Sequence, residues 1–225
     1  MTRTRLTLAL VLALASTSAW TAPQQDIEKI NGSITADAGQ TVGSMETVNG
    51  SIRIETGARA RNAETVNGSI HVADRAQVGD LETVNGSIRV ARNVRIGGDV
   101  ETVNGSVFVD RSGIVSGDIA TVNGAIGLVD TDLSGGIETV NGDITVGAGS
   151  HVRGGIRVEK PNSNWMPINL GKRRPPRIVI GPNAVVEGPM MFEREVKLYV
   201  HQSASVGSIT GATAMRYNTD RAPMD

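Results

Sequence analysis

The chain has 225 residues, among them 27 glycines and no cysteine, with an aromatic content of 3% and a formal net charge of -1. The near-neutral charge argues against nucleic acid as a partner, because phosphate binding needs a concentrated basic surface. Disorder is disfavoured as well, since β-branched residues recur at even spacing instead of being depleted. A core without aromatic bulk must be built from Val, Ile and Ala, and it contains no disulfide.

The N-terminus has the order of regions found in a secretory signal peptide. Two arginines precede an apolar run over residues 6–15, which is too short to span a bilayer, and small residues follow. We expect residues 1–22 to be a signal peptide that is cleaved after Ala19 or after Ala22. The mature protein is then expected in the periplasm or outside the cell, with no transmembrane segment.

The next part of the chain repeats one seven-residue motif, Glu-Thr-Val-Asn-Gly-Ser-Ile, in complete and varied copies. Its Asn-Gly pairs recur every 18 or 19 residues, and the stretch shows no apolar period of 3.6 residues, which argues against helical repeats. The asparagines of these pairs are Asn31, Asn49, Asn67, Asn85, Asn104, Asn123 and Asn141. We expect them to form a ladder in which each side-chain amide bonds to the next copy, because Asn stacks of this kind stabilise cross-β packing.

The apolar residues of the repeat predict a coil with three sides. They recur every six positions in two series, Ile88, Val94, Val100 and Val84, Val90, Ile96. Three such steps per repeat describe a triangular coil in which each short strand points two side chains inward. Gly and Asn turn the corners, because both tolerate positive φ. The predicted fold is therefore all-β: a single-stranded parallel β-helix, or β-solenoid, with coils of about 18 residues. Its handedness is left open, with a right-handed coil favoured.

Residues 159–176 interrupt this rhythm with several prolines, and we interpret them as a loop expelled from one corner of a coil. An exposed aromatic side chain beside basic residues is typical of an interaction surface. The candidate residues are Trp165, Met166, Lys172, Arg173, Arg174 and Arg177. There is an alternative interpretation for each group. Trp165 and Met166 pack on the solenoid wall instead of contacting a partner, and the basic residues belong to a solvated loop instead of a binding patch.

After the loop the six-residue step resumes in two further series, Ile180, Val186, Phe192, Leu198, Ala204 and Ile178, Ala184, Met190, Val196. The solenoid is therefore expected to be one domain over residues 23–211. Residues 212–225 are expected to form a polar tail that folds over the last coil.

Two sets of residues resemble known families. The units at 78–81, 96–100 and 115–119, which read Val-Gly-Asp-Leu, Ile-Gly-Gly-Asp-Val and Val-Ser-Gly-Asp-Ile, resemble the short coils of bactofilins, the polymer-forming bacterial cytoskeletal proteins. The Thr-Val-Asn-Gly-Ser-Ile copies look like those of exported bacterial proteins classed as adhesins. Together the resemblances cover residues 27–211 and imply a self-associating β-helix. Bactofilins are generally cytoplasmic, whereas this chain begins with an export signal.

No group of residues in the sequence has the pattern of a catalytic site. The histidines that an acyltransferase of the hexapeptide type would need are His71, His151 and His201, and none has an evident carboxylate partner to orient it. Glutamates recur at one position of the motif, namely Glu46, Glu64, Glu82, Glu101 and Glu138. They are expected to form a solvated edge, and calcium is not expected there because the nonapeptide of calcium-binding solenoids is missing. We therefore expect no catalytic residue, no metal and no cofactor.

The function favoured by the sequence is a non-enzymatic, exported structural or surface-associated scaffold. Solenoid ends expose unpaired strand edges, so end-to-end self-association is the first partner to expect. The alternative is an adhesin that binds carbohydrate or a cell-envelope surface through one outer face of the solenoid. A polysaccharide-modifying enzyme or a hexapeptide-type acyltransferase is the third, less favoured interpretation.

Overall fold

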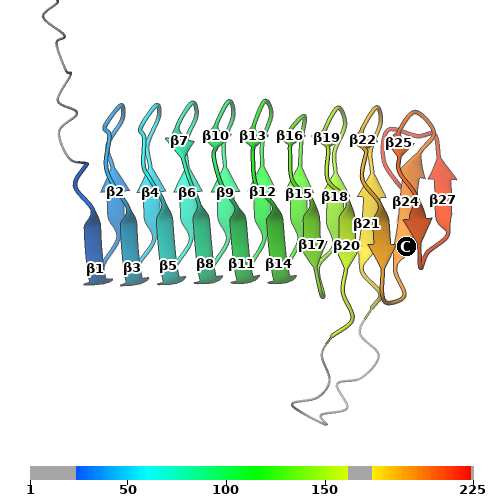
Figure 1. Ribbon diagram of the computed structural model, residues 1–225, viewed down its shortest axis with the longest axis horizontal. Helices are drawn as coiled ribbons and strands as arrows, with labels where there is room; N and C mark the ends of the chain where they lie inside the picture. Colours follow the sequence, from blue (N-terminus) through cyan, green and yellow to red (C-terminus); the bar gives the residue numbers. More distant parts are fainter. Residues whose placement is uncertain (1–23, 162–173, 224–225) are drawn as a thin grey trace, which may run out of the picture.

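Three parallel sheets run along the protein, because each turn of the chain stacks its strands on those of the turn before (Figure 1). The computed structural model describes residues 24–161 and 174–223. Within these ranges it contains strands and turns and no helix, so the predicted parallel β-solenoid is confirmed. None of the described segments is a helix long and apolar enough to cross a membrane. The expected signal peptide lies outside the described residues.

Two of the sheets have ten strands each. The first face consists of β1 (Ile27–Asn31), β3 (Met45–Asn49), β5 (Ala63–Asn67), β8 (Leu81–Asn85), β11 (Val100–Asn104), β14 (Ile119–Asn123), β17 (Ile137–Thr139), β20 (Ile156–Val158), β23 (Met190–Phe192) and β26 (Ile209–Thr210). The second face consists of β2 (Ile34–Ala36), β4 (Ile52–Ile54), β6 (Ile70–Val72), β9 (Ile88–Val90), β12 (Val107–Val109), β15 (Ile126–Leu128), β18 (Ile144–Val146), β21 (Arg177–Ile180), β24 (Lys197–His201) and β27 (Ala214–Tyr217).

The third face has shorter strands. It consists of β7 (Gln77–Val78), β10 (Arg95–Ile96), β13 (Ile114–Val115), β16 (Asp132–Leu133), β19 (His151–Val152), β22 (Val185–Val186) and β25 (Ser205–Val206). Isolated bridges from Gln77 to Arg59 and from Arg59 to Thr41 extend this face toward the N-terminus. Each coil therefore has three sides, as the six-residue step predicts.

The strands of neighbouring coils pair in register, so equivalent residues of the repeat lie in columns along the solenoid. On the first face Met45 pairs with Ala63, Ala63 with Leu81 and Leu81 with Val100, which makes one coil 18 or 19 residues long. A longer interval separates β20 from β23, because the insertion leaves the solenoid after β20 and returns to it before β21. It therefore lies at the corner between the first and second faces, and residues 162–173 of it are outside the described ranges.

The core is the bore of the coil, and one of the predicted inward series is wrong at its first member. Ile88, Val90 and Val94 are fully buried as expected, but Val84 has 40% of its surface exposed. The neighbouring Thr83 is buried in its place, with 4% exposed. The Thr83 hydroxyl donates a hydrogen bond to the carbonyl of Gly68 at 2.9 Å, which satisfies the buried polar group.

The corners also differ from expectation in what they require of glycine. At the Asn-Gly corner Gly86 stacks on Gly68, and a Cβ added to Gly86 would lie 1.9 Å from the Gly68 carbonyl oxygen. At Gly86 the close approach of the coils, and not positive φ, therefore excludes a side chain, whereas Gly32 and Gly124 of the same corner have positive φ. Positive φ is also found at the corner between the second and third faces, where Gly57 has φ 70°, Arg75 60° and Asn93 58°.

The C-terminal series of inward residues is confirmed, but the solenoid continues past residue 211. Strand β27 pairs with β24 and adds a tenth strand to the second face. The chain then turns back along the outer side of that face, where Ala222 packs against Val179, Tyr199 and Tyr217. The expected tail thus begins only after β27, and it packs against the side of the solenoid.

Candidate functional site

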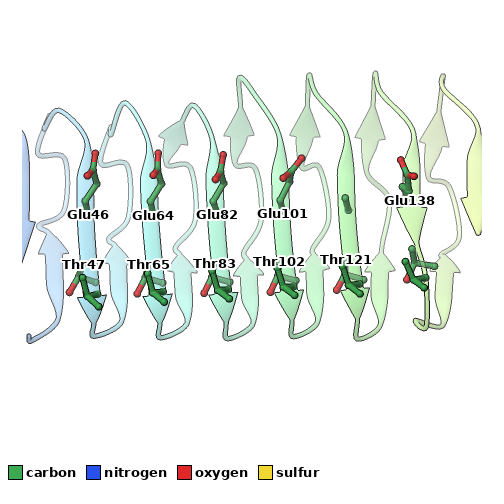
Figure 2. Close-up of a pocket in the computed structure, with 18 of the residues that line it drawn as sticks. Glu46, Thr47, Glu64, Thr65, Glu82, Thr83, Glu101, Thr102, Thr121 and Glu138 are labelled. Carbon is green, nitrogen blue, oxygen red and sulfur yellow. The ribbon is translucent and has the colours of Figure 1, made fainter. Parts of the chain in front are cut away.

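A groove with a volume of about 780 Å³ runs along the outer side of the first face (Figure 2). It is lined by the Glu, Thr and Val positions of successive motif copies, from β1 to β17, and by Glu159. Each coil contributes the same three positions of the motif because the coils are stacked in register, although Lys29 and Ile30 replace Thr and Val in the first copy and Ala120 replaces Glu in β14. The surface that results is long, narrow and periodic.

The valines of the motif form an apolar row in this groove. Alternation along β8 turns Leu81 and Thr83 inward, so Glu82 and Val84 point outward. The row consists of Val48, Val66, Val84, Val103 and Val122, with between 38% and 41% of each residue exposed, and of Ile30, with 73% exposed. A contiguous row of exposed apolar side chains is typical of an interaction surface. Sequence reasoning missed it because it placed the motif valine inside the bore.

The glutamates form a second row in the groove, which Figure 2 shows, and each lies two residues before a motif valine on the same side of its strand. Glu46, Glu64, Glu82 and Glu101 pair in register across four strands, Ala120 interrupts the row, and Glu138 resumes it. Partial burial raises the pKa of Glu64 and of Glu101, and neighbouring carboxylates raise both further. In the part of the chain that the structure describes, none of these row members takes part in an ion pair.

The predicted asparagines occupy one column at the corner between the first and second faces. Each Asn Nδ2 donates to the Oδ1 of the asparagine one coil earlier, at 3.0 or 3.1 Å, without a gap from Asn141 to Asn31. On the next coil the insertion takes the place of the Asn-Gly corner. Arg194 lies at the corresponding corner of the coil after that, between β23 and β24. The Arg194 guanidinium donates to Asn141 Oδ1 at 2.8 Å and to the Val140 carbonyl at 2.9 Å. Arg194 was not identified from the sequence, because it is separated from Asn141 by the insertion.

The candidate residues of the insertion divide into two groups. Trp165, Met166, Lys172 and Arg173 lie outside the described residues. Arg174 and Arg177, in contrast, have partners within the chain. Arg174 pairs with Asp143 at 2.5 Å, and the backbone N–H of Arg177 donates to the same carboxylate at 2.7 Å.

The Arg177 side chain is tied to the C-terminal end of the second face. Its guanidinium lies 4.9 Å from the ring centroid of Tyr199 and donates to the carbonyl of Pro223 at 2.8 Å. Together with the Asp143 contacts, these interactions hold the end of the insertion against the solenoid wall.

The histidines lie on the outer sides of the second and third faces, and none of them lines the groove. His151 has a carboxylate partner that the sequence did not reveal, since its Nε2 lies 2.6 Å from Glu187 Oε1 on the next coil. His201 contacts Ser203 through Nδ1 at 2.7 Å. His71 lies between Arg53 and Arg89 on neighbouring strands, and its pKa is lowered by burial and by these two cations.

The described residues contain no group of three or more His, Asp or Glu side chains placed to hold a metal ion. The class of protein is thus set by its architecture, a parallel β-solenoid with an acidic and apolar groove along one face. No family model matches the chain, and no curated protein or solved structure is significantly similar to it.

Proposed function

We propose that the protein is a non-enzymatic, exported structural scaffold whose solenoids associate end to end through the C-terminal coil. The signal-peptide pattern of residues 1–22 supports export. The stacked architecture supports a scaffold role, because a rod of similar coils provides a long surface and rigid spacing.

The last coil leaves apolar residues of the bore partly exposed, and this observation carries the proposal. Val206, Ile209 and Ala214 are only partly buried, whereas their partners on the coil before, Val186, Met190 and Leu198, are fully buried. Each of β25, β26 and β27 is the terminal strand of its sheet, so its outer edge has no strand partner among the described residues. A coil from another copy would bury these side chains and pair these edges.

The N-terminal coil is built differently. Lys29 stands in β1 at the inward position that Thr47 occupies in β3, and its ammonium group donates to the Ser33 carbonyl at 2.8 Å. A charged residue at an inward position of a terminal strand is a known way of preventing edge-to-edge association. We therefore assign the contact between copies to the C-terminal coil.

The test is the molecular mass of residues 23–225 as a function of concentration, measured by sedimentation equilibrium. Ile209→Lys places a charge on the open end of the bore and should abolish the end-to-end association. Thr210→Lys adds the same charge to the same strand, but on its exposed outer side, and should leave the association unchanged. A wild-type protein that stays monomeric, or equal effects of the two variants, would refute the contact. Ala214→Lys replaces Ile209→Lys if circular dichroism shows that the latter is unfolded.

The groove favours a second candidate function, a surface-binding adhesin. A long channel with an apolar row beside an acidic row can accept an extended polymer that lies along the solenoid. Binding of a soluble polysaccharide by the Ile209→Lys variant, which lacks the end-to-end contact, would support this role. It would also show that binding does not depend on association of the ends.

A further inference from the structure

The second face carries a column of basic residues that matches the acidic row of the first face. Arg53, His71 and Arg89 are the central residues of β4, β6 and β9, and they pair in register with their side chains exposed. They belong to the same coils as Glu46, Glu64 and Glu82. The solenoid therefore has an acidic side and a basic side along the same stretch of its length.

The acidic column repels itself in the single chain, and the two arginines of the basic column disfavour a charge on the His71 between them. Like charges directly opposite one another on neighbouring strands destabilise a sheet. The pKa of Glu64 is raised by burial and then by Glu82 and Glu46, and the pKa of His71 is lowered by burial and then by Arg89 and Arg53. A surface of opposite charge would relieve both columns.

We propose that solenoids of this protein also associate side by side, with the groove on the first face of one copy receiving the Arg53–His71–Arg89 column on the second face of another. The occupant of the groove is thus a second copy of this chain. The aliphatic stems of the arginines would cover the apolar valine row, while their guanidinium groups reach the glutamates.

The repeat distance is what selects a second copy over another cationic partner. Both columns advance by the spacing of stacked strands, about 4.8 Å, so one column can stay opposite the other over every coil. An extended peptide advances about 3.3 Å per residue, or about 6.6 Å between side chains on one side. Its cations would fall out of step with the glutamates within two or three coils.

The size of the contact predicts how strong it is. Three strands about 4.8 Å apart and about 16 Å long cover about 230 Å². This is less than about a third of the 800 Å² per partner that a stable complex of standard size buries. A single pair of copies should therefore associate weakly and in a salt-dependent way. Because two different faces meet, the contact does not close on itself in a dimer and can propagate to further copies.

Charge reversal provides a test with an internal control. Glu64→Arg/Glu82→Arg reverses the charge at the centre of the acidic column, and Arg53→Glu/Arg89→Glu reverses that of the basic column, so each variant alone should lose side-by-side association. An equimolar mixture of the two should regain it, because each groove then meets a column of opposite charge. The measurement is static light scattering at low ionic strength, and 0.5 M salt should weaken the association about tenfold or more, since it shortens the Debye length to a few ångströms.

A matched control changes the net charge equally at a different place. Arg59 and Arg95 point outward from the third face, and Arg59→Glu/Arg95→Glu should leave association as in the wild type. All variants are compared in the Ile209→Lys background as well, where the end-to-end contact is removed and the side contact should persist. A failure of one contact can thus be told from a failure of the other.

Three results would overturn the proposal. The first is a mixture that does not associate, and the second is a third-face control that disrupts association as strongly as Arg53→Glu/Arg89→Glu. The third is equal binding of a soluble oligoarginine by the wild type and by Arg53→Glu/Arg89→Glu when neither self-associates. That last result would assign the groove to a cationic partner other than this chain.

Discussion

At the scale of the residue, the glutamate row places carboxylates where their charge is unfavourable. Glu64 and Glu101 have raised pKa values because burial and neighbouring acids disfavour the ionised form. The folded state therefore binds the proton more tightly than the unfolded chain does. The favourable contribution of each carboxyl is present when it is protonated and is lost as the pH rises through its folded pKa. The contribution of these two carboxyl groups to the free energy of unfolding should thus be larger in mild acid than at neutral pH.

This predicts that Glu64→Gln raises the melting temperature at pH 7. Glutamine keeps the shape of the side chain and removes the charge that its neighbours disfavour. Below about pH 4 the difference should vanish, because the carboxyl is then largely protonated in both states. Thermal denaturation followed by circular dichroism measures the effect, and a lower melting temperature at pH 7 would show that the row is stabilised by a partner.

The gap in the row offers the converse experiment. Ala120 lies in register between Glu101 and Glu138. Ala120→Glu completes the row of charges and should lower the melting temperature at pH 7 relative to Ala120→Gln, which adds the same bulk. If the two variants melt at the same temperature, repulsion along the row is negligible.

At the scale of the structural element, the Asn-Gly corner depends on two separate features. The glycine allows close stacking, and the asparagine supplies a hydrogen bond to the next coil. Gly86→Ala places a Cβ 1.9 Å from a backbone oxygen, so the coils must move apart. Gly57, at the other corner, has φ 70° and no atom within 4 Å of an added Cβ. Gly57→Ala should cost about 1–2 kcal/mol of left-handed strain, and Gly86→Ala should cost more. Urea denaturation ranks the two, and the opposite order would refute the stacking requirement.

The asparagine ladder predicts a dependence on position. Asn85 bonds to Asn67 on one side and to Asn104 on the other, whereas Asn31 bonds only to Asn49 among the described ladder residues. Because these amides are exposed, each bond should contribute about 0.5–1.5 kcal/mol or less. Asn85→Ala should therefore lower the free energy of unfolding about twice as much as Asn31→Ala. Equal losses would identify the asparagines as independent turn formers.

Much of this element-level structure follows from the sequence, and the reasons for the errors are physical. The spacing of the Asn-Gly pairs determines the length of the coil, and the six-residue step determines its three sides. Thr83 and Val84 are adjacent and both β-branched, so neither spacing nor strand propensity shows which one faces inward. A hydrogen bond to the Gly68 carbonyl decides it. His151 and Glu187 meet only because an insertion of unpredictable length closes at one corner.

At the scale of the whole molecule, each coil contacts mainly its neighbours, so a coil should be removable. Deleting residues 64–81 joins Ala63 to Glu82, and Ala63 already pairs with Leu81 at the equivalent position. The product should fold as a solenoid about 4.8 Å shorter, with slightly lower stability. It loses one acidic and one basic residue from the two columns, so its association should persist. Small-angle scattering and sedimentation measure both properties.

The control deletes half a coil. Removing residues 64–72 joins Ala63 to Ala73 and eliminates an odd number of residues, which turns inward side chains outward beyond the junction. This variant should lose its cooperative unfolding transition. A cooperative transition like that of the wild type would contradict the three-sided coil.

The asparagine ladder has one more consequence, because all of its hydrogen bonds point the same way. Every amide donates toward the N-terminus, so the side-chain dipoles add along the solenoid as peptide dipoles do along a helix. The oxygen left over at Asn141 marks the negative pole, and the cationic Arg194 lies against it. The column is therefore a directional array whose bonds polarise one another. Its two poles are electrically unlike, and a guanidinium group neutralises one of them.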